Sequence, residues 1–324
     1  MLDVDQNKKE AHLHYTKAYE FYNLNLYKEA FEELTKATEL DPENEIYLKI
    51  KGMVSYKLGN YEDALQVFEK LTKIAPKEAE YYFNEASTLF CLKRYNEALE
   101  KFDYLISLEP KNGIHYYGKG IVFFELKKYS EALLAFEDAV KLCPFNPKYH
   151  FYKGLTLIEI GMYEDSISEL EKVIALNPYD AEAYFNEGFV LILLEKYDLA
   201  AEKFENAIKL DPKNILYKYF YGYMLSKIGL LEFAKQEIGS GLILDPHNPY
   251  LLITFAEILA SLNKPEIGKN RLIIELKLKP EIKEELCSQA FAELSYGMIN
   301  DKERDFLQNF IDTFCRDHPI IGKT

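Results

Sequence analysis

The chain has 324 residues and 48% of them are hydrophobic, so it can bury a core and is not an intrinsically disordered chain. Its formal net charge of -14 at pH 7 argues against non-specific binding to nucleic acids or anionic membranes, because both need a basic surface. The same charge either keeps the outer surface well solvated or suits a basic partner.

Residues 1–10 are polar and are expected to be frayed. Beyond them, prolines recur at a fixed interval of 34 residues: Pro42, Pro76, Pro110, Pro144, Pro178, Pro212, Pro246 and Pro280. A constant interval of this length indicates stacked supersecondary units. Proline lacks the N–H that continues a helix, so each proline is expected to follow the end of a helix.

The proline interval divides the chain into eight repeats. Their predicted bounds are 11–44, 45–78, 79–112, 113–146, 147–180, 181–214, 215–248 and 249–282. Each repeat is expected to contain a first helix of about fourteen residues, a short turn, and a second helix of similar length.

Two sets of matched positions indicate how the two helices of a repeat pack. The eighth position is always small: Ala18, Gly52, Ala86, Gly120, Gly154, Gly188, Gly222 and Ala256. The twenty-fourth position is always large and apolar: Leu34, Phe68, Phe102, Phe136, Leu170, Phe204, Ile238 and Leu272. Because the distance between packed helices depends on the side chains at the contact, small residues opposite large ones predict closely packed pairs.

Further matched positions carry a resemblance to a known family. The seventeenth position is tyrosine in the first six repeats: Tyr27, Tyr61, Tyr95, Tyr129, Tyr163 and Tyr197. The twentieth is small: Ala30, Ala64, Ala98, Ala132, Ser166, Ala200, Ala234 and Gly268. Together with positions eight, twenty-four and thirty-two, this pattern resembles the tetratricopeptide repeat over residues 11–282. The resemblance implies an all-α, right-handed superhelical solenoid of eight helix-turn-helix repeats.

The turn inside each repeat is expected near the fifteenth position. Gly59, Gly161 and Gly229 allow a positive φ there, and Asn25 and Asn263 can adopt it at some cost. Lys93, Lys127 and Glu195 hold the same position elsewhere. These three residues tolerate a positive φ poorly, so their turns are expected to be less strained or differently shaped.

The last repeat and the residues after it depart from the pattern. Pro265 occupies the seventeenth position of the eighth repeat, so its second helix is expected to start late or to kink. Residues 283–324 are predicted to form a capping helix pair and a tail, because the exposed end of a solenoid needs a cover. The first of these helices is expected over 281–295. Asn300 and Glu303 form a capping box for the second, and the tail from His318 is expected to be loose.

The cysteines and the first residues of the chain indicate the cellular compartment of the protein. Cys91, Cys143, Cys287 and Cys315 show no ligand spacing, so they are expected to be buried, reduced thiols. No stretch approaches the roughly 18 apolar residues of a membrane span. The first residues are acidic and lack the basic-then-apolar order of a signal peptide. A cytoplasmic protein without membrane attachment is therefore predicted.

The sequence contains no motif for catalysis, a cofactor or a metal. Phosphate-binding glycine motifs are absent. His12 and His14 lie on different faces of a helix, and His150 holds a packing position, so it is expected to be a satisfied core residue. We therefore predict that the chain is not an enzyme and that it uses neither a cofactor nor a metal.

The inner surface implied by the resemblance is rich in aromatic residues. In the family, the second, fifth, ninth, twelfth and thirteenth positions of the first helix line a concave groove. The candidate partner-binding residues here are Tyr15, Tyr19, Tyr22, Lys49, Phe83, Asn84, Tyr117, Phe151, Phe185, Asn186, Phe189, Tyr219 and Tyr223. A monomer rarely exposes such an apolar surface unless it binds something, and aromatic rings give large contact areas.

Three interpretations of these residues stay open at this point. The rings could hold a peptide or amphipathic helix, they could stack on adjacent repeats, or the chain could fill its own groove by dimerising or by folding back its C-terminal helices. Asn84 and Asn186 could bond a ligand's backbone or a neighbouring helix. The family's carboxylate clamp is matched only by Lys49 and Asn84 and is not expected.

The sequence therefore predicts a non-catalytic protein–protein interaction scaffold or co-chaperone-like adaptor. Its partner is a protein or peptide held in the aromatic groove. The alternative is a self-associating repeat protein, such as a homodimer, whose groove or cap serves oligomerisation.

Overall fold

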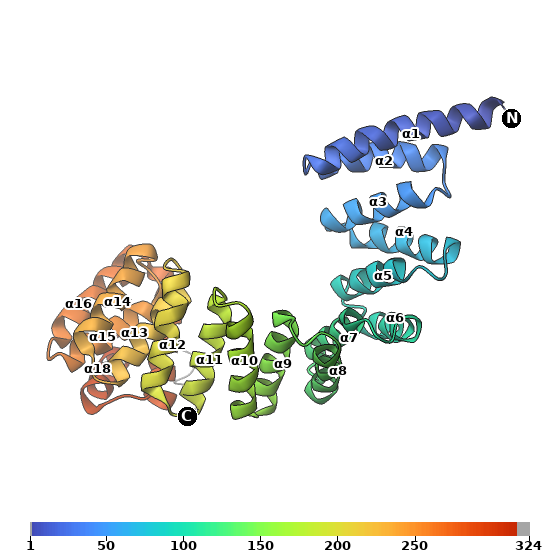
Figure 1. Cartoon of the computed structure of the whole chain (residues 1–324). Helices are drawn as coiled ribbons and strands as arrows, with labels where there is room; N and C mark the ends of the chain where they lie inside the picture. Colours follow the sequence, from blue (N-terminus) through green and yellow to red (C-terminus); the bar gives the residue numbers. More distant parts are fainter. Residues whose placement is uncertain (1, 316–324) are drawn as a thin grey trace. The chain divides into compact units, whose positions relative to one another are not determined.

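The computed structural model describes residues 2–315, and all regular structure in that range is helical. The contacts divide the chain into two compact units, Met1–Gly161 and Met162–Thr324. The prediction of an all-α repeat architecture is confirmed, with consecutive helices packed against each other inside each unit (Figure 1).

The first unit contains nine helices within its described residues. They are α1 (Leu2–Asn23), α2 (Tyr27–Leu40), α3 (Glu45–Lys57), α4 (Tyr61–Ile74), α5 (Ala79–Cys91), α6 (Tyr95–Leu108), α7 (Gly113–Glu125), α8 (Tyr129–Leu142) and α9 (Pro147–Ile160). The odd-numbered helices are the first helices of the predicted repeats, and each packs on the helix before it and the helix after it within the unit.

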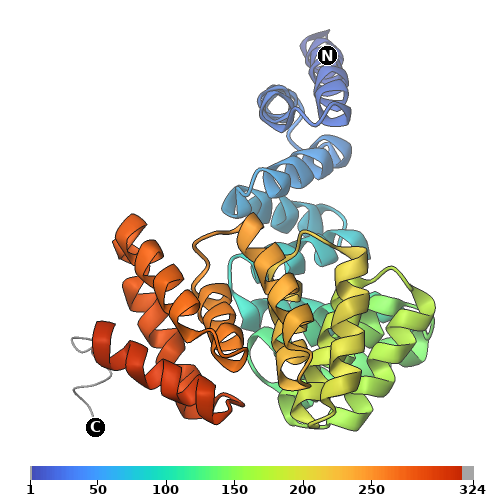
Figure 2. The ribbon, with the colours of Figure 1, turned by 90° about the vertical axis from the view of Figure 1, so that its left-hand side faces the viewer.

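The second unit continues the same order. It contains α10 (Tyr163–Leu176), α11 (Ala181–Leu193), α12 (Tyr197–Leu210), α13 (Ile215–Lys227), α14 (Leu231–Leu244), α15 (Pro249–Ser261), α16 (Pro265–Leu278), the 3-10 helix η1 (Pro280–Ile282), α17 (Lys283–Tyr296) and α18 (Asp301–Phe314). The last two helices pack on each other and on α15, as the orange and red ribbons of Figure 2 show.

The repeat bounds follow from local chemistry. Each second helix ends two residues before its proline, as at Leu40 before Pro42. Most first helices begin after an Asn or Asp whose side chain accepts a backbone N–H, which satisfies a donor at the helix start. The capping residues are Asn44, Asn112, Asn146, Asp180, Asn214 and Asn248.

The predicted small-against-large packing is present inside the repeats. Phe136 is fully buried, and a Cβ placed on Gly120 would lie 2.6 Å from its ring. The same arrangement joins Gly188 and Phe204 in the second unit, where the distance would be 2.9 Å. An alanine at either glycine would therefore require the opposing phenylalanine ring to shift.

Three local expectations are wrong. Lys93, Lys127 and Glu195 adopt left-handed φ values of 59°, 57° and 58°, so their turns match those of the other repeats. The packing of both helices fixes this turn and overrides the local preference. Residues 2–10 are the start of α1 and not a frayed segment. Helix α16 begins at Pro265 in the usual position, because proline is tolerated in the first turn of a helix.

The C-terminal helix pair is close to the prediction. Helix α17 covers residues 283–296, preceded by η1, and Asn300 and Glu303 form the expected capping box of α18. The apolar residues Phe306, Phe310 and Ile311 are buried on one side of α18. The expected loose tail from His318 lies outside the described residues.

The prediction of buried, reduced thiols is half right for each cysteine, because Cys287 and Cys315 are buried but oxidised, whereas Cys91 and Cys143 are free thiols that are not fully buried. Cys287 and Cys315 form a disulfide with a Cα–Cα distance of 5.7 Å, which joins α17 to the end of α18. Cys91 is half-buried and Cys143 is exposed. The disulfide partners are 28 residues apart in the sequence and are brought together by the antiparallel packing of the two helices.

Candidate functional site

The aromatic rings at the fifth repeat position pack across the boundary to the next repeat. Tyr15 stacks on Tyr47 and Tyr117 stacks on Tyr149, both with ring centroids 4.9 Å apart. Tyr47 and Tyr149 each hold the third position of the following repeat. One face of each of these two fifth-position rings is therefore committed to the stack, and both rings stay half-buried.

The candidate residues of α1 include the most exposed ring of the set. Tyr19 is 45% exposed and stacks on the half-buried Tyr22 at 6.5 Å. Tyr22 meets Tyr27 of α2 edge-on at 5.8 Å. Tyr19 thus presents a free aromatic surface that Tyr22 and Tyr27 hold in place.

The inner faces of α3 and α5 enclose a pocket of about 250 Å³. It is lined by Met53, Tyr56, Lys57, Phe68, Phe83, Asn84 and Ser87. The candidate residues Phe83 and Asn84 both belong to this lining. Asn84 is half-buried, and its side-chain amide has no hydrogen-bond partner between residues 2 and 315. The pocket combines an apolar wall with an unused donor and acceptor.

The edges of this pocket carry polar contacts of two kinds. Tyr56 and Cys91 lie within hydrogen-bond distance, with 3.1 Å between hydroxyl oxygen and Sγ. Burial and this contact raise the pKa of Tyr56. The candidate Lys49 forms an ion pair with Glu80 at 2.7 Å, whereas Lys57 is exposed and forms no ion pair within the described range. Lys57 is therefore the available cation beside the pocket.

The candidates on α9 and α11 are half-buried. The ring of Phe151 lies 5.7 Å from that of Tyr152. Phe185 stacks on Tyr217 at 5.0 Å and also meets Phe204 and Phe220. These contacts make Phe185 a packing residue on at least three sides.

The other two candidates of α11 also have contacts within the chain. Phe189 lies edge-on to Phe220 with ring centroids 6.2 Å apart. Asn186 donates its amide to the carbonyl of Glu182 on its own helix at 2.8 Å. It therefore differs from Asn84, whose amide is unused.

Tyr219 and Tyr223 of α13 face the chain's own C-terminal helices. The Tyr223 hydroxyl donates to Glu293 Oε2 of α17 at 3.4 Å. Burial raises the pKa values of both tyrosines, and the carboxylate of Glu293 adds to the rise. A partner at these two residues would compete with α17, so the chain fills its own inner surface at this end.

A buried polar cluster joins α17 and α18 to the inner faces of α13 and α15. Glu303 Oε2 accepts from Lys227 Nζ at 3.2 Å, and its Oε1 accepts from Ser261 Oγ at 2.7 Å. Gln289 Nε2 donates to Glu293 Oε1 at 2.9 Å. Charges at this depth require partners, and Glu303 and Glu293 have them.

Glu257 in the same cluster is different. It is 1% exposed, and neither of its carboxylate oxygens has a hydrogen-bond partner within the described structure. Burial raises its pKa well above the usual range, and the nearby Glu293 raises it further. An ionised Glu257 would thus be destabilising here.

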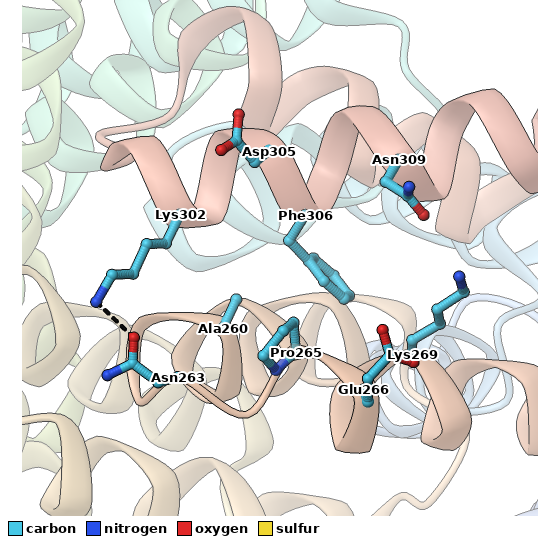
Figure 3. Close-up of a pocket in the computed structure, with 9 residues that line it drawn as sticks. All are labelled: Ala260, Asn263, Pro265, Glu266, Lys269, Lys302, Asp305, Phe306 and Asn309. Carbon is cyan, nitrogen blue, oxygen red and sulfur yellow. Dashed lines mark hydrogen bonds between the residues drawn. The ribbon is translucent and has the colours of Figure 1, made fainter.

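A second cleft, of about 460 Å³, lies between the start of α16 and α18 (Figure 3). It is lined by Ala260, Asn263, Pro265, Glu266, Lys269, Lys302, Asp305, Phe306 and Asn309. Lys302 Nζ donates to Asn263 Oδ1 at 2.8 Å and closes one end. The lining carries two lysines and two carboxylates, so the cleft has no dominant charge.

His150 and His14 both contact polar groups of the chain itself. His150 is buried and its Nε2 lies 2.9 Å from the carbonyl of Pro144, as expected for a satisfied core residue. His14 lies 2.6 Å from Glu33. Residues 2–315 hold no group of three or more His, Cys, Asp or Glu arranged for a metal ion. No helix there is both long and apolar enough to cross a membrane.

Sequence reasoning missed the polar residues that hold the C-terminal helices. Lys227 and Ser261 both hold the thirteenth repeat position, which was assigned to the groove without a role for individual residues. Their partner Glu303 was found only as a capping residue. The sequence did offer one signal for this contact, because Lys227 is a cation at a position expected on the inner surface.

Comparison with known proteins identifies the repeat. Models of the tetratricopeptide repeat match residues 15–79, 83–147, 147–180 and 181–214, which together are more than half of the chain. The last two ranges coincide with the predicted fifth and sixth repeats. No curated protein matches the chain.

Solved structures with a similar fold include a tetratricopeptide repeat protein from Parabacteroides merdae. It has 17% identity and a TM-score of 0.58, and the match covers 76% of this chain and 98% of that one. A chain of the APC/C hetero-tetramer Cut9–Hcn1 has 17% identity and a TM-score of 0.51, covering 90% of this chain and 54% of that one.

YrrB, described as a TPR protein with an unusual peptide-binding site, has 25% identity and a TM-score of 0.47. The match covers 57% of this chain and 95% of YrrB. The family-model matches, with the repeated helix pairs on which they fall, establish that this chain belongs to the tetratricopeptide repeat family.

Proposed function

We propose that this chain is a non-catalytic interaction scaffold, an adaptor of the co-chaperone-like kind, that holds a peptide or amphipathic helix of a partner protein. Its family consists generally of such scaffolds. The proposed binding surface is the inner face of the first unit, where Tyr19 is exposed and Phe83 and Tyr117 are half-buried. Tyr219 and Tyr223 are not part of it, because α17 already lies against them.

The pocket between α3 and α5 is the observation that carries this proposal. An apolar side chain of a bound segment would fill the space beside Met53 and Phe83. The unused amide of Asn84 can both donate to and accept from the segment's backbone. Such pockets, with a mostly apolar lining and a few placed polar groups, are typical of binding sites.

The test fills the pocket without removing any packing. Ser87→Tyr adds a ring to the lining, and Asn84→Ala removes the amide that has no partner within the chain. Asn186→Ala is the matched control, because it has the same repeat position and its amide is bonded to Glu182. Phe185→Ser would be a poor test, since it removes three ring contacts.

The measurement is a crosslinking pull-down from an extract of the source cells, compared between variants. We expect one enriched partner that is lost with Ser87→Tyr, weakened with Asn84→Ala and retained with Asn186→Ala. Thermal unfolding of each variant checks that the fold persists. A partner retained by both pocket variants would place the binding surface elsewhere and refute the proposal.

The alternative of self-association is tested by light scattering on the pure protein. A dimer that Ser87→Tyr abolishes, with no enriched partner, would favour it. The cytoplasmic location stays a prediction, and the Cys287–Cys315 disulfide is more typical of an oxidising compartment.

A further inference from the structure

The contact between the C-terminal helices and α13–α15 shows which chemistry an inner face of this chain binds. Helix α18 buries an apolar stripe that includes Phe306, Leu307 and Phe310. In its first turn, Glu303 is held by Lys227 and Ser261. The bound element is thus an amphipathic helix with a carboxylate at the edge of its apolar stripe.

The two residues that hold Glu303 occupy the same position in successive repeats. Lys227 is the thirteenth residue of the seventh repeat, and Ser261 is the thirteenth of the eighth. The full set at that position is Asn23, Lys57, Cys91, Glu125, Glu159, Leu193, Lys227 and Ser261. A cation occurs there only in the second and seventh repeats.

The second and third repeats carry a similar pair of residue types at these two positions. Lys57 is followed by Cys91 at the next thirteenth position, as Lys227 is followed by Ser261. Cysteine and serine differ only in the chalcogen atom, and both place a small polar group at this point. Cys91 is fixed there by Tyr56, 3.1 Å away.

The two sites differ in what covers them. Lys227 is buried by α18 and paired with Glu303. Lys57 is exposed, has no ion pair between residues 2 and 315, and lines the open pocket of about 250 Å³. A carboxylate placed at Lys57 would form a charge-assisted hydrogen bond, while an apolar residue beside it enters the pocket.

We propose that the inner face of the second and third repeats binds an acidic amphipathic helix of a partner protein, with a carboxylate on Lys57 and an apolar side chain between Met53 and Phe83. This rests on the proposed function and names the chemistry of the partner. Two other kinds of partner are disfavoured at this surface. A wholly apolar helix would leave Lys57 unpaired, and a basic segment would be repelled by it.

The probe is a labelled peptide of residues 299–314, the chain's own α18 with its cap, added to the full-length protein. Binding is followed by fluorescence anisotropy. Lys57→Glu is expected to weaken binding at least about tenfold, because it turns the attraction between Lys57 and the peptide's carboxylate into repulsion. Lys73→Glu makes the same charge change on α4, outside the pocket lining, and is expected to leave binding unchanged.

A charge swap makes the test specific. A peptide with Glu303→Lys should bind the native chain weakly and recover binding to the Lys57→Glu variant. Peptide exchange into the second unit, against the native α18, would be insensitive to Lys57→Glu. Absence of binding, or binding unaffected by Lys57→Glu, would overturn the inference. If these peptide tests fail but the pull-down partner is still lost with Ser87→Tyr, the proposed function stands and only the acidic-helix inference is wrong.

Discussion

At the scale of single residues, the turns between paired helices differ in backbone strain. All of them use a left-handed residue, but some repeats supply glycine and others supply Lys93, Lys127 or Glu195. A residue with a Cβ loses about 1 kcal/mol or more in this region, because the Cβ approaches the following carbonyl. The repeat packing imposes the turn regardless of the residue present.

Replacing Lys93 by glycine should therefore stabilise the chain. We expect the free energy of unfolding to rise by about 0.5–1 kcal/mol, since relief of strain exceeds the entropy that glycine adds to the unfolded chain. Gly59→Ala makes the opposite change, and should lower the free energy of unfolding by a similar amount. No atom lies within 4 Å of a Cβ at Gly59, so steric contacts do not contribute.

Urea denaturation followed by circular dichroism measures both variants. A loss of stability in Lys93→Gly would show that the lysine side chain makes a contribution larger than the strain. The result would also identify the turns at Lys127 and Glu195 as sites for the same change.

At the scale of elements, the contact between α15 and α17 encloses a carboxyl group that lacks partners. Glu257 of α15 is buried near Tyr219, Tyr223 and Lys227 of α13, Glu293 of α17 and Glu303 of α18. Burial is the largest cause of its raised pKa, and Glu293 is the next. Only Lys227 among these charges favours the ionised form.

The sign of the pH effect follows from this raised pKa. The folded state binds a proton at Glu257 more tightly than the unfolded state does, so stability falls as the pH rises above the unfolded pKa. Glu257→Met should stabilise the second unit by about 1–3 kcal/mol at pH 7–8. The gain should shrink as the pH falls through the unfolded pKa of about 4.3, because below it the carboxyl is neutral in both the folded and the unfolded state.

Thermal unfolding at several pH values checks this, with Glu284→Met on the exposed part of α17 as the control. A gain that is the same at pH 4 and pH 8 would mean that the methionine acts through packing alone. A loss of stability at pH 8 would mean that Glu257 is ionised and held by Lys227.

The sequence predicted the elements better than the contacts between them. Pro42 and its equivalents mark helix ends because proline excludes a continuing helix, and Asn300 with Glu303 marks a helix start for an equally local reason. Lys93 and Pro265 were misjudged because their local preferences are overridden by packing in one case and by a first-turn position in the other.

The candidate site was only partly accessible to sequence reasoning. The inner-face aromatics could be placed from the repeat pattern, but which ring is free depends on the neighbouring repeat. Tyr15 stacks on Tyr47, whereas Tyr19 has an open face. Tyr223 and Glu293, 70 residues apart, meet only because the C-terminal helices turn back, and no periodicity encodes that contact.

At the scale of the whole molecule, the chain closes the exposed end of its own stack. Helix α15 has buried residues on both of its faces, including Leu252, Ile253 and Ile258, because α16 covers one side and α17 and α18 cover the other. Terminal repeats of a solenoid need such a cover to remain dispersed in water. The disulfide ties the two covering helices to each other.

A chain that ends at Ile282 should therefore self-associate. Deleting residues 283–324 exposes the apolar inner face of α15, and Glu257 then regains water while Ile253 loses its cover. We expect light scattering to show dimers or larger species, and hydrogen exchange to accelerate first in α15 and α16. The first unit should exchange as before, because repeats interact mainly with their nearest neighbours.

The double variant Cys287→Ser and Cys315→Ser gives an intermediate case. The disulfide closes a loop of 28 residues, which corresponds to about 3.6 kcal/mol in the chain-entropy model. Exchange should accelerate in α17 and α18 while the protein stays monomeric, since the polar cluster around Glu303 remains. A truncated chain that stays monomeric with α15 still protected would show that the helix pair is no cap, and that the inner face of α15 is stable when it is exposed to water.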